Sequence, residues 1–274
     1  MTTMRIPCSP HGRRFFWVAS ATLLVLPQLS AQTAKQLVAD ACYNELQQRK
    51  QEPFWASQVL RHANGHVYLE KEIETSAGPV HRLLLADGRE PTPSERRQEE
   101  DRLRKLRSNP SVQESMKKTR AEEEKKADDV LHVVSDVFLF EDQGRQGDQE
   151  KLAFRPNPAY VPKTREEMVL HAMSGTMLID LQDKCFAQVS ATLTQQVDFG
   201  HGLIGSLKKG GVVEIKRIRL SPGVWKTYSI KVDINGRIIL FKTISEQQDE
   251  TRSDFKPLAA DTSIEQALEK LAGS

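Results

Sequence analysis

The stretch WKTYSIKVDINGRIILFKTI, residues 225–244, decides the fold. Apolar and polar side chains alternate along its first half, as in a β-strand with one apolar face. The apolar positions are Tyr228, Ile230, Val232 and Ile234. Asn235-Gly236 is the pair that most readily forms a type I′ turn, so the stretch predicts a β-hairpin that turns at these two residues.

The same alternation occurs upstream, where Ala187, Val189, Ala191 and Leu193 alternate with polar residues. From Gly175 to Glu246, candidate strands follow one another with only turn residues between them, which predicts an antiparallel meander. Three more strands are predicted between Phe54 and Leu85, and a short one at Lys151–Arg155. A sheet with one apolar face needs a cover from the rest of the chain.

Helices are predicted where apolar residues recur at helical spacing or a capping signal occurs. The predicted helices are Thr33–Lys50, a short helix opened by the pair Thr164 and Glu167, and Thr262–Leu271. Phe140–Gly147 has the composition of an acidic loop, and Gln247–Asp261 is polar and loosely patterned.

Residues 94–129 differ in composition from the rest of the chain, with 11 basic and 10 acidic residues among 36. Mixed charges at helical spacing favour exposed helix, and Asn109-Pro110 predicts a break between two helices. Only Val130–Phe138 has an apolar stripe, so we expect the rest to bury little apolar area. The charges nearly cancel, which argues against a nucleic-acid partner.

The N-terminus has the pattern of a secretory signal peptide. Three arginines precede the apolar run Phe15–Leu26, and the small-residue end Leu29-Ser30-Ala31 follows it. The run is shorter than the roughly 20 residues that span a bilayer. We therefore expect cleavage after Ala31, export to the periplasm by the Sec or the twin-arginine route, and a mature chain without a transmembrane segment.

Two cysteines remain in the mature chain, Cys42 and Cys185. In an oxidising compartment they could form a disulfide, since Cys185 shares strand parity with Val189 and Cys42 lies on the helix that could cover that face. The alternative is two small buried thiols.

No motif in the sequence has the context that catalysis or cofactor binding requires. Gly200-His-Gly-Leu-Ile-Gly205 matches the dinucleotide fingerprint, but no acidic residue follows about 20 positions later and strands, not a βαβ unit, flank it. The histidines lack metal-ligand spacing. We expect no enzyme, no cofactor and no metal.

Three segments carry a family resemblance: SGTMLIDLQDKCFAQVSATL (174–193), VDFGHGLIGSLKKGGVVEI (197–215) and LSPGVWKTYSIKVDINGRIILFKTISEQQDETRSDFKP (220–257). Their spacing of Gly-x-x-x-Ile-Asp, an alternating strand and Pro-Gly-x-Trp resembles the outer-membrane lipoprotein-sorting (LolA/LolB-like) superfamily, in its uncharacterised exported bacterial members. The resemblance implies an α+β fold with a curved antiparallel sheet, an unclosed barrel covered by helices. It also implies an apolar concave face that accepts acyl chains or lipidated proteins.

The predicted organisation is a signal peptide (1–31), the N-terminal helix and first strands (32–93), a charged helical insertion (94–137), the remaining strands and lid helix (138–257), and a C-terminal tail with a short helix (258–274). The predicted function is that of a non-enzymatic lipid- or lipoprotein-binding carrier. The alternative is a periplasmic interaction or sensor module, with an envelope protein partner and a cavity that is closed core. The expected ligand-contacting residues are Val189, Ala191, Leu193, Tyr228, Ile230 and Val232.

Overall fold

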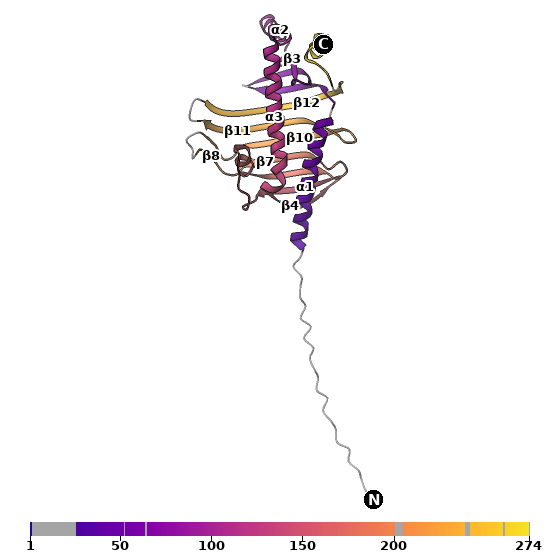
Figure 1. Cartoon of the computed structure of the whole chain (residues 1–274), viewed down its shortest axis with the longest axis vertical. Helices are drawn as coiled ribbons and strands as arrows, with labels where there is room; N and C mark the ends of the chain where they lie inside the picture. The colour runs from indigo at the N-terminus through magenta and orange to yellow at the C-terminus, as the bar shows by residue number, and fades with distance from the viewer. Residues whose placement is uncertain are drawn as a thin grey trace.

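A computed structural model describes residues 1, 26–51, 53–63, 65–200, 205–238, 242–259 and 261–273 of the chain. In this part of the chain, 12 strands form one antiparallel sheet that does not close on itself, and five helices accompany it (Figure 1). The predicted fold class, α+β with a curved unclosed antiparallel sheet and a charged helical insertion, is confirmed.

The sheet follows the order β3-β2-β1-β12-β11-β10-β7-β6-β5-β4, and the short pair β8 and β9 joins it at β11. The strands are β1 (Trp55–Ala63), β2 (His66–Ile73), β3 (Val80–Ala86), β4 (Phe138–Gln146), β5 (Gln149–Pro156), β6 (Met173–Asp180), β7 (Cys185–Leu193), β8 (Val197–Phe199), β9 (Gly205–Leu207), β10 (Val212–Ser221), β11 (Val224–Ile238) and β12 (Lys242–Pro257). The first and last strands of the chain thus pair in the middle of the sheet.

The helices are α1 (Leu26–Gln51), α2 (Pro93–Ser108), α3 (Pro110–Val137), α4 (Arg165–Leu170) and α5 (Ile264–Ala272). Asn109 ends α2, and its side chain accepts a hydrogen bond from the backbone N–H of Ser111 at the start of α3. The predicted break at Asn109-Pro110 is therefore confirmed. Helix α1 begins earlier than the predicted Thr33.

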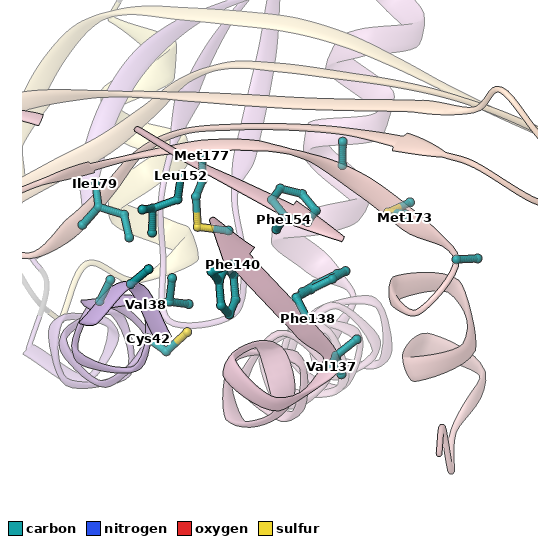
Figure 2. Packing of buried hydrophobic residues seen from close by; sticks show 14 of the residues in the cluster. Val38, Cys42, Val137, Phe138, Phe140, Leu152, Phe154, Met173, Met177 and Ile179 are labelled. Atoms are coloured by element: carbon teal, nitrogen blue, oxygen red, sulfur yellow. The ribbon is translucent and has the colours of Figure 1, made fainter. Parts of the chain in front are cut away.

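Helices α1 and α3 run across the strands over one face of the sheet (Figure 1). The buried residues of α1 are Ala34, Val38, Ala41 and Cys42, a helical stripe that faces β4 to β7. Figure 2 shows this stripe against the large apolar side chains of β4, β5 and β6. The main core therefore lies between α1, the end of α3 and this half of the sheet.

A second cluster of buried residues joins α2 and α5 to β1, β2 and β3. Leu106 of α2 is 4% exposed in this cluster, and Met116 of α3 packs against it. Glu99 of α2 also accepts a hydrogen bond of 3.0 Å from the backbone N–H of Leu83 on the edge strand β3. The expectation that the charged segment packs only at its end is wrong, because single apolar residues among the charges are enough to anchor it.

The hairpin does not turn at Asn235-Gly236. These residues pair with Ser245 and Ile244 inside the ladder of β11 and β12, and the connecting residues 239–241 lie outside the described part of the chain. A Cβ at Gly236 would lie 2.6 Å from the carbonyl oxygen of Ser206 on β9. The glycine is therefore required by the close approach of β9 and not by a turn.

Two polar segments that were expected to be irregular are strands. Strand β12 continues to Pro257 instead of ending near Glu246, and β4 occupies most of the expected loop Phe140–Gly147. On β4, an edge strand, polar side chains are exposed. The polar side chains of β12 have a different explanation, because part of the face that the helices cover is charged.

Candidate functional site

Three of the predicted ligand-contacting residues lie in the closed core. Leu193 is fully buried and Ala191 is 6% exposed, and Val189 is partly buried against the same cluster. Helix α1 covers this face, and the large apolar side chains of the neighbouring strands β4 to β6 belong to the same cluster. The structure therefore brings these residues together, but as packed core.

The other three predicted residues lie on β11. Ile230 stands in one register row with Val189, because both pair with Ile215 of β10, and Val232 stands in one row with Ala191 through Val213. Tyr228 is the exception. The register passes from Ser229 opposite Lys216 to Thr227 opposite Arg217, so Tyr228 is the unpaired residue of a β-bulge.

Of the two alternatives for Cys42 and Cys185, the structure has the two buried thiols and not the disulfide. Cys42 packs in the main core, while Cys185 accepts a hydrogen bond of 2.9 Å from the side-chain amide of Gln48 on α1. Burial, together with the charge of Glu45, raises the pKa of Cys42 to about 12. Burial also raises the pKa of Cys185, against the lowering effect of the Gln48 hydrogen bond. The two thiols are thus buried in different clusters, Cys42 on α1 and Cys185 on β7.

A cavity of about 590 Å³ lies between the second half of α1, the middle of α3 and the covered face of β2 and β10 to β12. We call it the charged chamber. Its charged lining residues are Glu45, Arg49, Lys50, Glu72, Glu74, Arg120, Glu124, Asp128, Arg217, Lys226 and Arg252, and the apolar part of its wall includes Phe54, Trp225, Ile230 and Phe255. The volume is within the range of pockets that hold small molecules.

The covering helices change from apolar to charged where they reach the chamber. On α1, the buried stripe of Val38 and Ala41 continues at helical spacing to Glu45 and Arg49. On α3, buried Val137 gives way to Asp128, Glu124 and Arg120, which lie about two and a half to five turns earlier. The switch occurs on both helices at the same place above the sheet.

The sheet changes in the same way. Ile230 faces the chamber on β11. The lining residues one and three strands away are Arg252 of β12 and Glu72 of β2. Glu72 is 5% exposed although it is a carboxylate. The face that is apolar over β5 to β7 is thus charged over β12 and β2.

Ion pairs neutralise most of the charges that line the chamber. Such pairing is needed most by the enclosed ones, such as Glu72 and Arg217, because a charge that leaves water unpaired is costly. Each carboxylate that lines the chamber has a basic partner on another turn or another element. The pairs are Glu45 with Arg217 (2.5 Å), Glu74 with Lys226 (3.2 Å), Glu72 with Arg252 (3.4 Å), Glu124 with Arg120 (2.6 Å) and Asp128 with Arg49 (3.8 Å).

Arg252 is the most enclosed cation whose contacts are incomplete. Its Nε lies 3.4 Å from Glu72 and its Nη2 lies 2.9 Å from Glu250, whereas Nη1 is buried and has no hydrogen-bond partner among the described residues. Burial by itself would lower the pKa of Arg252, but the charges of Glu72 and Glu250 outweigh it and the pKa is raised. Arg252 is therefore a fixed cation with one unused donor group.

Trp225 forms a rigid part of the chamber wall. Its indole N–H donates a hydrogen bond of 2.8 Å to Asp183, a carboxylate in the turn between β6 and β7 that also binds Arg219. The same turn holds α1, since Asn44 donates to the carbonyl oxygen of Asp183 at 3.2 Å. One turn thus fixes both the covering helix and the aromatic wall.

Sequence reasoning missed the charged chamber because its residues look like a solvated strand face. The signal was present, however, since Glu70, Glu72 and Glu74 recur at every second position of one strand region. Three like charges on one side of a strand repel one another unless cations face them. Arg252 and Lys226 supply those cations from strands that are about 150 to 180 residues distant in the chain.

A comparison of the chain with protein-family models, with curated proteins and with solved structures found no match. Within the described ranges, no group of three or more His, Cys, Asp or Glu side chains is placed to hold a metal ion. None of the described helices combines the length and the apolar character needed to cross a bilayer.

Proposed function

We propose that this chain is an exported, non-enzymatic binding protein that carries an amphiphilic molecule, in keeping with its resemblance to the LolA/LolB-like superfamily. The observation that carries the proposal is the charged chamber, a cavity of about 590 Å³ between an unclosed sheet and the two helices that cover it. An open half-barrel with a partly filled mouth suits a ligand that enters between sheet and helix.

The ligand site differs from the one that the sequence predicted. The apolar rows through Val189 and Ala191 are packed under α1, so an acyl chain could enter there only by displacing the helix. Ile230, in contrast, lines the chamber beside Trp225 and Phe255. The ligand's apolar part would lie against these three side chains, and its polar part would face the surrounding charges.

A pair of variants tests this placement. Ile230→Phe should partly fill the chamber, weaken the binding of a dansyl-labelled undecanoic acid and change the melting temperature little. Ala191→Leu should leave binding unchanged but lower stability by about 1–3 kcal/mol, because it overpacks a closed core. The reverse pattern would place the ligand on the predicted apolar rows and reject the chamber.

A second candidate is the interaction or sensor module, and one observation favours it. All five carboxylates of the chamber already have basic partners, so the chamber could be a purely structural polar interior. Native mass spectrometry of protein from the exported fraction separates the two candidates. A co-purifying amphiphile supports the carrier, whereas protein without ligand that also ignores added dansyl-undecanoic acid supports the module.

A further inference from the structure

The charged chamber has more positive than negative groups. Six basic and five acidic side chains line it, and each of the five acids is already ion-paired. Lys50, an exposed lining residue, forms no ion pair with any described residue. Among the lining side chains, the cations therefore outnumber the carboxylates by one.

Two buried hydrogen-bond donors, one in the chamber wall and one behind it, have no acceptor among the described residues. Nη1 of Arg252 is buried without a partner, and so is the indole N–H of Trp55. The Trp55 ring packs between two lining residues, with Lys226 5.7 Å from its centroid and the Phe255 ring 6.5 Å away. A buried donor without an acceptor is costly, so Arg252, which lines the chamber, favours a ligand that supplies acceptor oxygens.

We propose that the charged chamber binds the anionic group of an amphiphile, a carboxylate or a phosphate, with Arg252 and Lys50 as its main cationic contacts. This inference rests on the proposed carrier function and names the chemistry of the ligand's polar end. A planar guanidinium held on two sides by Glu72 and Glu250 is oriented in advance for an oxyanion.

The chamber carries its own reporter. The chain has three tryptophans, Trp17 in the predicted signal peptide, Trp55 behind the chamber wall and Trp225 in the wall itself. Tryptophan fluorescence of the mature protein therefore reports on this site alone. We would titrate the protein with dodecyl phosphate, dodecanoate, uncharged dodecanol and inorganic phosphate, each below its aggregation concentration.

The expected result is that dodecyl phosphate and dodecanoate bind at least roughly tenfold more tightly than dodecanol. Arg252→Lys, which keeps the charge but removes the spare donor, should reduce that preference by roughly tenfold. Arg89→Lys is the control, because Arg89 is also ion-paired to a glutamate but does not line the chamber, and it should leave the binding of all four probes unchanged.

Should Arg252→Lys lose its strand signal in circular dichroism, Lys50→Gln takes its place, since an exposed side chain can be changed without loss of the fold. Lys50→Gln should weaken the binding of dodecyl phosphate and dodecanoate by roughly two- to fivefold and leave the binding of dodecanol unchanged.

The other outcomes separate the two proposals. Equal binding of dodecanol and dodecyl phosphate would overturn the anionic site but keep the carrier. If inorganic phosphate bound as tightly as dodecyl phosphate, the result would support the anion site and contradict the proposed carrier function. No fluorescence change with any probe would reject both.

Discussion

Arg217 of β10 donates a hydrogen bond of 2.5 Å to Glu45 of α1, and the two side chains are only 11% and 14% exposed. This ion pair stands where the apolar core under α1 ends and the charged chamber begins. It links the covering helix to the middle of the sheet, so it should matter more for stability than the surface ion pairs of the same helix.

We expect Glu45→Gln to lower the free energy of unfolding by about 1–3 kcal/mol, because it leaves the enclosed guanidinium of Arg217 without a counter-charge. The matched control is Asp40→Asn on the same helix, whose partner Lys184 is 47% exposed. That change should cost at most about 1 kcal/mol. Urea denaturation measures both, and equal small losses would show that Arg217 is well solvated.

The charged segment should contribute to stability through Leu106. Leu106→Ala removes a side chain that is 4% exposed and should cost about 2–4 kcal/mol. Val112→Ala, at a position 38% exposed on α3, should cost about 0.5 kcal/mol or less.

Because Leu106 is buried in the second cluster, deletion of Pro93–Asp128 should destabilise the sheet. A deletion variant that melts like the full chain would mean that the second cluster is dispensable.

The sequence predicted well those elements whose structure depends on one local pattern. Alternation identified β7 and β11, and Asn109-Pro110 marked the boundary between α2 and α3. The prediction failed where a strand that is distant in the sequence determines the local structure. Asn235-Gly236 has the chemistry of a turn, but β9 approaches Gly236 so closely that the glycine is needed inside the strand.

The candidate site could be predicted only in part for a related reason. Parity correctly put Val189, Ala191 and Ile230 on one face, but parity cannot say where a covering helix stops closing that face. The β-bulge that displaces Tyr228 has no local signal. The charged half of the face was hidden because Glu72 and Arg252, adjacent to each other in space, each look solvent-exposed in their own segment.

Gly236→Ala tests the strand assignment of that glycine. A Cβ there would lie 2.6 Å from the carbonyl oxygen of Ser206, so β9 would have to move and stability should fall by about 1–3 kcal/mol. Gly273→Ala, with nothing within 4 Å of the added atom, is the control and should be neutral. If Gly236→Ala lowered stability no more than Gly273→Ala, position 236 would lie in the predicted turn and not inside the strand.

The export prediction concerns the N-terminus. If a signal peptidase cleaves after Ala31, the mature chain starts at Gln32 and keeps the buried α1 residues Ala34, Val38 and Ala41. Intact-mass and N-terminal sequencing of the exported protein check this. Ala31→Leu, which removes the small residue that the peptidase needs, should retain the precursor. An unprocessed Met1 terminus on the exported wild-type protein would contradict the prediction.

The two free thiols make stability depend on alkaline pH. Burial raises the pKa of Cys42 to about 12 from the ordinary value of 9.0, so above pH 9 the unfolded chain releases a proton that the folded chain still holds. The stabilising contribution is complete below pH 9 and declines between pH 9 and about 12, by up to about 1.4 kcal/mol per pH unit.

Cys42→Ala isolates this effect from the lysines and tyrosines that titrate in the same range. The variant should be less stable than the wild type at pH 8, because it leaves a small cavity, and the difference should shrink as the pH rises above 9. Denaturation curves at pH 8 to 11 measure the difference, with reductant present so that only thiols titrate. If the stabilities of the variant and the wild type changed in parallel with pH, Cys42 would be accessible to water. If the mass of the non-reduced wild type were lower by the two hydrogens lost on oxidation, Cys42 would be bonded to Cys185.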